Sequence, residues 1–193
     1  RTINKVIADG AGGFIIVWDQ KDATDFNVYA QKVNSTGQPL WGANGIAVCN
    51  AANDQYGADL VQDANNQFFV TWRDQRNDPL NSRSPQTYAQ RLDPNGVAQW
   101  TANGIQISNT ISYPIGVVSD EDGGAIIAYL DARNSLLDAN NMQTNWDIFA
   151  QRVNEAGAVQ WTANGLPVCT QNKNQAVENN KPGLAVVPDN LGG

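Results

Sequence analysis

The chain has 193 residues, with 12 Lys and Arg against 19 Asp and Glu, no His and two Cys, and its formal net charge is −7. This negative charge argues against a nucleic-acid partner, because phosphate binding needs clustered Lys and Arg. No apolar run approaches the roughly 18 residues of a membrane helix, and the lack of His leaves little for a metal site. We therefore expect no nucleic acid, no membrane span and no cofactor.

The first 50 residues predict four β-strands, over residues 4–8, 14–19, 27–34 and 40–49. The second strand is apolar at consecutive positions from Phe14 to Trp18, which indicates burial on both faces, as between stacked sheets. The segments 9–13 and 34–37 carry the Gly, Asp and Asn residues that tight hairpins need. No segment shows a convincing helical period, so we expect an all-β fold.

The same pattern recurs twice more along the chain. The stretch 27–50 is matched by 87–109 and 147–170, and 12–21 is matched by 66–76 and 123–133. Each copy has an aromatic-Ala-Gln triplet, then a Trp, then an Asn-Gly pair whose glycine follows the triplet's aromatic by 16 residues. These markers are Tyr29, Trp41 and Gly45; Tyr88, Trp100 and Gly104; and Phe149, Trp161 and Gly165. Constant internal spacing in three copies indicates a tandem structural repeat.

Four-stranded antiparallel units of about 55 residues are typical of β-propeller blades, whose apolar faces must be covered by neighbouring units. The sequence predicts blades over residues 1–50, 57–109 and 114–170, and 183–193 aligns with the first strand and turn of a fourth. Closed propellers need roughly four to eight blades. We therefore expect a propeller segment that packs against the remaining blades of a larger parent chain.

The connections between strands fall into two classes. Those joining the first strand to the second, and the third to the fourth, have constant length in all copies. The other connections vary, over residues 20–27, 75–86 and 132–147 and over 50–56, 109–113 and 170–182. In an up-and-down sheet these variable loops share one end, and binding residues tend to lie on loops held by a rigid scaffold. This variable loop face is the predicted contact surface for a protein or glycan.

The repeat resembles the propeller repeats of large secreted bacterial surface proteins, of the form D-x-x-G-G-φ-φ-φ-φ-W-x-D-x-R followed by D-I-Y-A-Q-R-φ-N-x-x-G-x-x-x-W-x-x-N-G. The third copy matches best, at Asp120, Gly123, Gly124, Asp131, Arg133, Asp147, Ala150, Gln151, Arg152, Gly157, Trp161, Asn164 and Gly165. The resemblance implies a propeller in an extracellular or cell-surface protein, often exported by type IX secretion. It implies little about biochemical activity, because a fold does not fix a function.

Each copy carries charged residues where its second strand enters the variable loop face. They are Asp19 with Lys21, Asp74 with Arg76, and Asp131 with Arg133. They could form a charged ring that binds a polar ligand. The alternative, which we favour, is a repeated structural ion pair, because Arg suits bidentate pairing with a carboxylate.

The loop 132–147 is the strongest candidate for partner binding. It is the longest connection between second and third strands, and it carries apolar groups that a solvated loop does not require. Trp146 has no equivalent aromatic in the second copy, so the repeat does not demand it. The candidate residues are Leu136, Leu137, Asp138, Met142, Trp146 and Asp147.

Two further features have structural interpretations. The acidic turn at Asp120–Gly124 is faintly like a calcium loop, but a calcium ion wants six to eight oxygens and we expect a hairpin turn. Cys49 and Cys169 hold equivalent positions in non-adjacent copies, and a disulfide needs Cα atoms within about 7 Å. We therefore expect that they do not pair.

Three functions remain open from the sequence. The first is a non-catalytic binding module that uses the variable loop face, and the second is a structural spacer in a large surface assembly. The third is a propeller glycosidase, which needs a pair of carboxylates about 5 to 10 Å apart. The variable loops show no shared set of carboxylates, so we expect no enzyme and favour binding.

Overall fold

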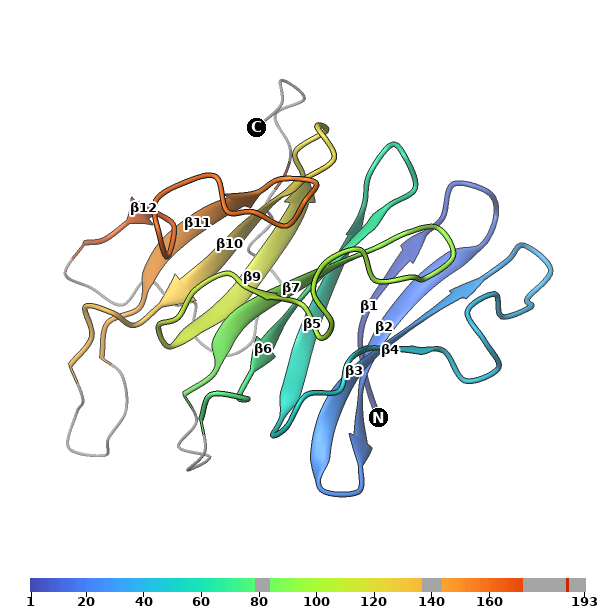
Figure 1. Cartoon of the computed structure of the whole chain (residues 1–193), viewed down its shortest axis with the longest axis horizontal. Coiled ribbons are helices and arrows are strands. Elements are labelled where there is room, and N and C mark those ends of the chain that lie inside the picture. The colour runs from blue at the N-terminus through green and yellow to red at the C-terminus, as the bar shows by residue number, and fades with distance from the viewer. Residues whose placement is uncertain (79–83, 137–143, 172–186, 188–193) are drawn as a thin grey trace.

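A computed structural model describes residues 1–78, 84–136, 144–171 and 187. Within these ranges the chain is all-β, with twelve strands and no helix that could cross a membrane. The strands form three four-stranded antiparallel sheets, each ordered as in the sequence (Figure 1). Sheet one contains β1 (Thr2–Ala8), β2 (Phe14–Asp22), β3 (Asp25–Val33) and β4 (Ile46–Cys49). Sheet two contains β5 (Gln55–Gln62), β6 (Phe68–Asp74), β7 (Gln86–Leu92) and β8 (Ile105–Gln106). Sheet three contains β9 (Ser112–Ser119), β10 (Ala125–Asp131), β11 (Asp147–Val153) and β12 (Leu166–Cys169).

Sheet two lies between the other two sheets and packs against both (Figure 1). Its strand β6 is buried from Phe68 to Trp72, as the unbroken apolar run predicts. Phe68, Val70 and Trp72 belong to the core shared with sheet one, whereas Phe69 belongs to the core shared with sheet three. Successive side chains of a strand point to opposite faces. An apolar run without alternation therefore fits a strand covered on both sides.

The second-strand aromatic of each repeat faces the triplet's aromatic across the hairpin. Trp18 pairs with Tyr29, Trp72 with Tyr88, and Tyr129 with Phe149. The rings of each pair stack, with centroids 5.8, 6.4 and 6.4 Å apart. The number of residues between the partners differs among the repeats. The pairing is nevertheless the same, because the variable loops absorb the difference.

The predicted fourth strand over 40–49 is too long. In sheet one the strand is limited to Ile46–Cys49, and the preceding segment is a loop. The buried Gln31 side chain holds this loop, since its Oε1 accepts the Trp41 backbone N–H at 2.8 Å and its Nε2 donates to the Gly42 carbonyl at 2.6 Å. Gln90 and Gln151 make the equivalent contacts in the other sheets. The glutamine of each triplet therefore replaces strand pairing over this loop.

The Asn-Gly pair lets the loop return close to its own sheet. Gly104 has a φ of +83°, and a Cβ there would lie 2.4 Å from the Trp72 ring and 2.6 Å from the Ala89 carbonyl oxygen. Gly45 and Gly165 are equally crowded, against Trp18 and Tyr129. Only glycine fits both the positive φ and the close approach.

The constant turns share one hydrogen-bond pattern. In the turn that begins each β1–β2-type hairpin, an Asp Oδ1 accepts the backbone N–H groups two and four residues later, as at Asp9, Asp63 and Asp120. The turns that begin at Asn34, Asp93 and Asn154 repeat this arrangement. Because the side chain replaces missing backbone partners, the turn length is fixed.

All six constant turns lie at one end of the sheets, which we call the turn end, and the variable connections lie at the other, the loop end. The β1–β2 turn is at the top of Figure 1 and the β2–β3 hairpin at the bottom. The predicted loop 20–27 is wrong in its bounds, because β2 and β3 pair as far as Asp22 and Asp25. This hairpin closes tightly through Ala23, whose φ is +51°.

Candidate functional site

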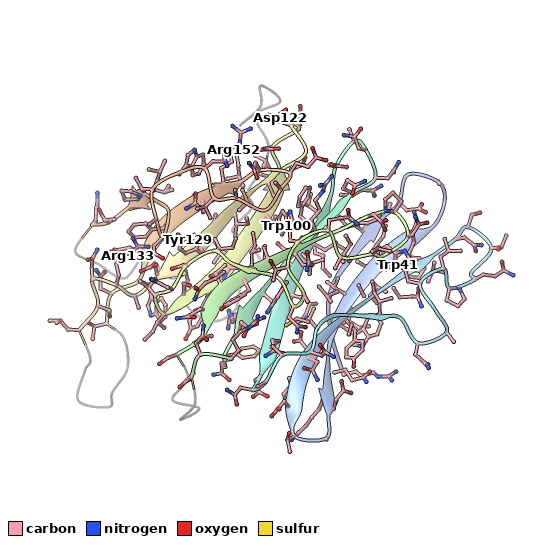
Figure 2. All side chains as sticks on the ribbon, in the orientation of Figure 1. Trp41, Trp100, Asp122, Tyr129, Arg133 and Arg152 are labelled. Carbon is pink, nitrogen blue, oxygen red and sulfur yellow. The ribbon has the colours of Figure 1, made fainter. Side chains whose placement is uncertain are left out.

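Buried ion pairs occupy the loop end of sheets two and three. The Asp74 carboxylate is fully buried and accepts two bonds from the Arg76 side chain, Nε to Oδ1 at 2.9 Å and Nη2 to Oδ2 at 2.6 Å. Trp72 Nε1 donates to the same Oδ2 at 2.7 Å. Asp131 and Arg133 form the matching bidentate pair, at 2.8 and 2.7 Å. Arg133 lies at the loop end of sheet three, far from Arg152 and Asp122 at the turn end (Figure 2).

Each of these arginines also fastens the loop that carries the Asn-Gly pair. Arg76 Nη2 donates to the Asn103 carbonyl oxygen at 2.6 Å, and Arg133 Nη2 donates to that of Asn164. The arginine therefore joins the second strand, the variable loop and the fourth-strand loop of one sheet. Both aspartates, and the Nε and Nη2 groups of both arginines, are therefore used within their own sheet, which favours the structural ion pair over a charged ring that binds a polar ligand.

The first repeat does not contain this pair, and the sequence alignment of Asp19 and Lys21 with it is wrong. The positions opposite Asn27, Gln86 and Asp147 on the third strands are Gln20, Asp74 and Asp131. Gln20 therefore takes the place of the buried aspartate. Its Nε2 donates to Asp22 Oδ1 at 2.7 Å.

Asp19 and Lys21 make separate contacts instead. Asp19 accepts hydrogen bonds from the Asn4 side chain at 2.5 Å and from the Gly57 backbone N–H of sheet two at 3.0 Å. Burial raises the pKa of this carboxyl above its ordinary value. Lys21 Nζ lies 6.0 Å from the centre of the Phe26 ring.

In sheets one and two the segment at the end of the fourth strand reaches the buried aspartate of the following sheet. Cys49 Sγ lies 3.7 Å from Asp74 Oδ2 and accepts from Arg76 Nη2 at 3.2 Å. Ser108 takes the corresponding position against Asp131, at 3.4 Å. Burial raises the pKa of the Cys49 thiol to about 12. Neither Cys49 nor Cys169 is in a disulfide, as their positions in sheets one and three predict.

The acidic turn at Asp120–Gly124 is a hairpin turn whose first carboxylate is fully used. Asp120 Oδ1 accepts the Asp122 and Gly124 backbone N–H groups, and its Oδ2 accepts from Arg152 Nε at 2.7 Å. Its oxygens are therefore committed within the turn.

The loop end carries a stack of aromatic and guanidinium groups between sheets two and three. The Trp146 ring stacks on Tyr113, with centroids 4.6 Å apart and an interplanar angle of 26°. The Arg73 guanidinium carbon lies 4.3 Å from the centre of the Tyr113 ring and 5.9 Å from that of Tyr56. All four side chains are only partly buried. We call Tyr56, Arg73, Tyr113 and Trp146 the aromatic stack.

The base of loop 132–147 is closed by hydrogen bonds and carries an exposed leucine. The Thr144 backbone N–H donates to the Leu136 carbonyl oxygen at 3.0 Å and closes the loop base. The Leu136 side chain is 77% exposed. Asp147 is buried and accepts from Asn134 Nδ2 at 2.8 Å, so it anchors the loop. Leu137, Asp138 and Met142 lie outside the described residues.

The sequence alone identified Trp146 and missed its three neighbours in the stack. Tyr56 and Tyr113 open the first strands of the second and third repeats, and Arg73 ends a buried run, so each is a routine strand residue in sequence. The recurrence of Tyr at the strand start was a usable signal. Their contact depends on packing between sheets, which the repeat pattern does not describe.

A search of known protein families found no match, and no curated protein is significantly similar to the chain.

Proposed function

We propose that the chain is a segment of a β-propeller that serves as a non-catalytic binding module of an extracellular or cell-surface protein. Stacked four-stranded sheets in chain order support the propeller arrangement, since each new first strand, β5 and then β9, packs against the preceding sheet. The resemblance of the repeat supports the location. Export by type IX secretion belongs to the same proposal.

The observation that carries the binding function is the aromatic stack. Partly exposed Trp, Tyr and Arg side chains are the residue types that dominate binding energy at protein interfaces. The repeated fold does not require Trp146, because Pro85 holds the equivalent position of the second repeat, three residues before the triplet's aromatic. The exposed Leu136 in the same loop favours a protein partner over a glycan, since an aliphatic group adds apolar contact but no sugar-ring stacking.

The state of three carboxylates at the loop end supports binding rather than catalysis. Asp74, Asp131 and Asp147 are buried at the loop end, and each accepts hydrogen bonds from neighbouring side chains. A glycosidase needs one carboxylate that protonates a leaving group and a second that faces the sugar. These three carboxylates, buried and hydrogen-bonded to neighbouring side chains, suit neither role.

The test uses the chain as an immobilised bait for extracellular proteins of its source organism, read by quantitative mass spectrometry. Proteins retained by the wild type should be lost by about tenfold or more with Trp146→Ala, because an anchor ring contributes roughly 1–3 kcal/mol. Val97→Ala is the matched control, since Val97 is an exposed apolar residue at the turn end.

A glycan array probed with the same three proteins separates the two partner classes. If the chain binds glycans but no protein, and Trp146→Ala abolishes that binding, the partner is a sugar and not a protein. Retention of the same proteins by the Trp146→Ala variant would refute the assignment of the binding surface.

A further inference from the structure

One contact recurs at both interfaces between sheets and joins a tryptophan to a glycine. Trp41 of sheet one lies on the constant turn of sheet two, where a Cβ on Gly96 would come within 2.9 Å of the indole ring. The Trp41 Nε1 donates to the Pro94 carbonyl oxygen of that turn at 3.1 Å. The Trp41 ring is therefore held by close contact with Gly96 and by a directional hydrogen bond to the Pro94 carbonyl.

Sheets two and three repeat this contact. A Cβ on Gly157 would lie 2.9 Å from the Trp100 ring, and Trp100 Nε1 donates to the Glu155 carbonyl oxygen at 2.9 Å. The two tryptophans occupy corresponding places in their sheets (Figure 2). A glycine in these turns is thus a socket for the tryptophan of the preceding sheet.

Each interface has a second hydrogen bond, from a backbone N–H of the preceding sheet to an asparagine side chain of the next sheet. The Asn50 N–H donates to Asn103 Oδ1 at 3.0 Å, and the Asn109 N–H donates to Asn164 Oδ1 at 3.0 Å. Both interfaces therefore use one set of contacts in one register. This recurrence provides a template for any further interface between sheets of this repeat.

Sheet one presents the same socket with no occupant among the described residues. Gly37 holds the position of Gly96 and Gly157 and has a φ of +81°, but nothing lies within 4 Å of its Cβ position. The adjoining sheet face is also open, because Phe14 is 38% exposed whereas its counterpart Phe68 is fully buried. A groove of about 510 Å³ runs over this face, past Phe14, Ile16 and Trp18.

Sheet three presents the complementary surface. Trp161 occupies the position of Trp41 and Trp100, yet it is only partly buried. Val168 of β12 is 63% exposed, whereas Val48 and Ile107 at the equivalent positions are 4% and 2% exposed. Apolar residues that the other two repeats bury are thus uncovered at this edge.

We propose that a second copy of this chain docks on the outer face of sheet one and places its Trp161 on Gly37. The Thr170 N–H of the second copy corresponds to the N–H groups of Asn50 and Asn109, so it donates to Asn44 Oδ1. The interface joins two different faces and is heterologous. Copies therefore associate head to tail, as a ring or an open array, and not as a two-fold dimer.

Sedimentation velocity over a concentration series tests the proposal with Gly37→Asn. Asparagine tolerates a positive φ, and the open space around Gly37 accommodates its side chain within one copy. It collides only with an incoming indole ring. Gly10→Asn is the matched control, because Gly10 has a φ of +74° in the other turn of sheet one and also has nothing within 4 Å.

We expect wild type and Gly10→Asn to associate as concentration rises to about 100 μM, a range in which modest interfaces become populated, and Gly37→Asn to stay monomeric. Trp161→Ala should be monomeric too. A mixture of Gly37→Asn and Trp161→Ala should form a 1:1 dimer, because each variant retains the face that the other has lost.

Two results would overturn the proposal. One is a wild-type chain that remains monomeric throughout the series, which would leave the face to a different occupant, such as another repeat of a longer polypeptide. The other is association of Gly37→Asn equal to that of the wild type.

Discussion

The buried glutamine of each triplet shows how a single side chain determines local structure. Gln90 is fully buried, and its Oε1 accepts the backbone N–H groups of Arg91 and Trp100 while its Nε2 donates to the Thr101 carbonyl oxygen. An amide has both a donor and an acceptor, so it can replace two strand partners at once. An apolar residue at this position would leave three backbone groups without partners.

We predict that Gln90→Ala lowers the free energy of unfolding by about 3 kcal/mol, because each unsatisfied buried group costs about 1–3 kcal/mol. Urea unfolding followed by tryptophan fluorescence measures this change. Gln99→Ala is the control, since Gln99 is exposed and makes one local bond. Equal stability of the two variants would contradict the role assigned to Gln90.

Cys49 makes the stability of the chain sensitive to alkaline pH. The folded thiol has a pKa of about 12 because of burial, whereas an unfolded cysteine loses its proton near pH 8.5. Above that pH the unfolded state binds fewer protons than the folded state, so the free energy of unfolding falls as pH rises toward 12.

Cys49→Ser should remove about 1 kcal/mol or more of this decline at pH 10. Serine already occupies the equivalent position at Ser108, so we expect the variant to fold. Urea unfolding of both proteins at pH 7 and pH 10 measures the difference. Parallel declines in the two proteins would show that Cys49 does not cause the pH dependence.

At the scale of the elements, the glycines of the constant turns distinguish contacts between sheets from turn geometry. Gly37, Gly96 and Gly157 share a φ of +81° to +83°. They differ in their surroundings, because Trp41 covers Gly96 and Trp100 covers Gly157. Asparagine tolerates a positive φ. The difference between its effects at Gly96 and at Gly37 therefore measures the cost of displacing the ring.

We predict that Gly96→Asn lowers the free energy of unfolding by about 1–3 kcal/mol, as other overpacked sites do, whereas Gly37→Asn changes it by less than about 0.5 kcal/mol. Thermal unfolding in dilute solution, where the chain is monomeric, gives both values. A destabilisation of equal size at both sites would indicate that the turn, and not the tryptophan, disfavours asparagine.

The strands and turns could be predicted from the sequence because their determinants are local. Consecutive apolar residues specified β6, and the Asp and Asn of each turn specified the hairpins. The start of the fourth strand could not be placed, because it depends on Gln31, which lies about ten residues away in sequence and holds the loop before the strand. Asp19 and Lys21 were matched to the Asp–Arg pair with an error of one residue, since the alignment followed charge and not the Trp18–Tyr29 pairing.

At the scale of the whole molecule, the sequence predicted that sheets stack but not which side chains meet between them. The aromatic stack is formed by two strand residues of sheet two and two residues of sheet three, 56 to 146 in the chain. The repeat places Tyr56 and Tyr113 at equivalent positions, but it does not predict that they meet Arg73 and Trp146. Contacts of this kind arise from the relative placement of the sheets, so only coordinates could reveal that Trp146 has partners.

The three repeats form separate four-stranded sheets that pack in chain order, and sheets one and two each place a tryptophan on a turn of the next sheet. Proton NMR tests this packing directly through nuclear Overhauser effects between indole and glycine α protons, with the Gly37→Asn variant used because it is expected to stay monomeric at the concentration that NMR needs. We predict cross-peaks between Trp41 and Gly96 and between Trp100 and Gly157. Cross-peaks from Trp41 and Trp100 only to residues of their own repeats would contradict the account.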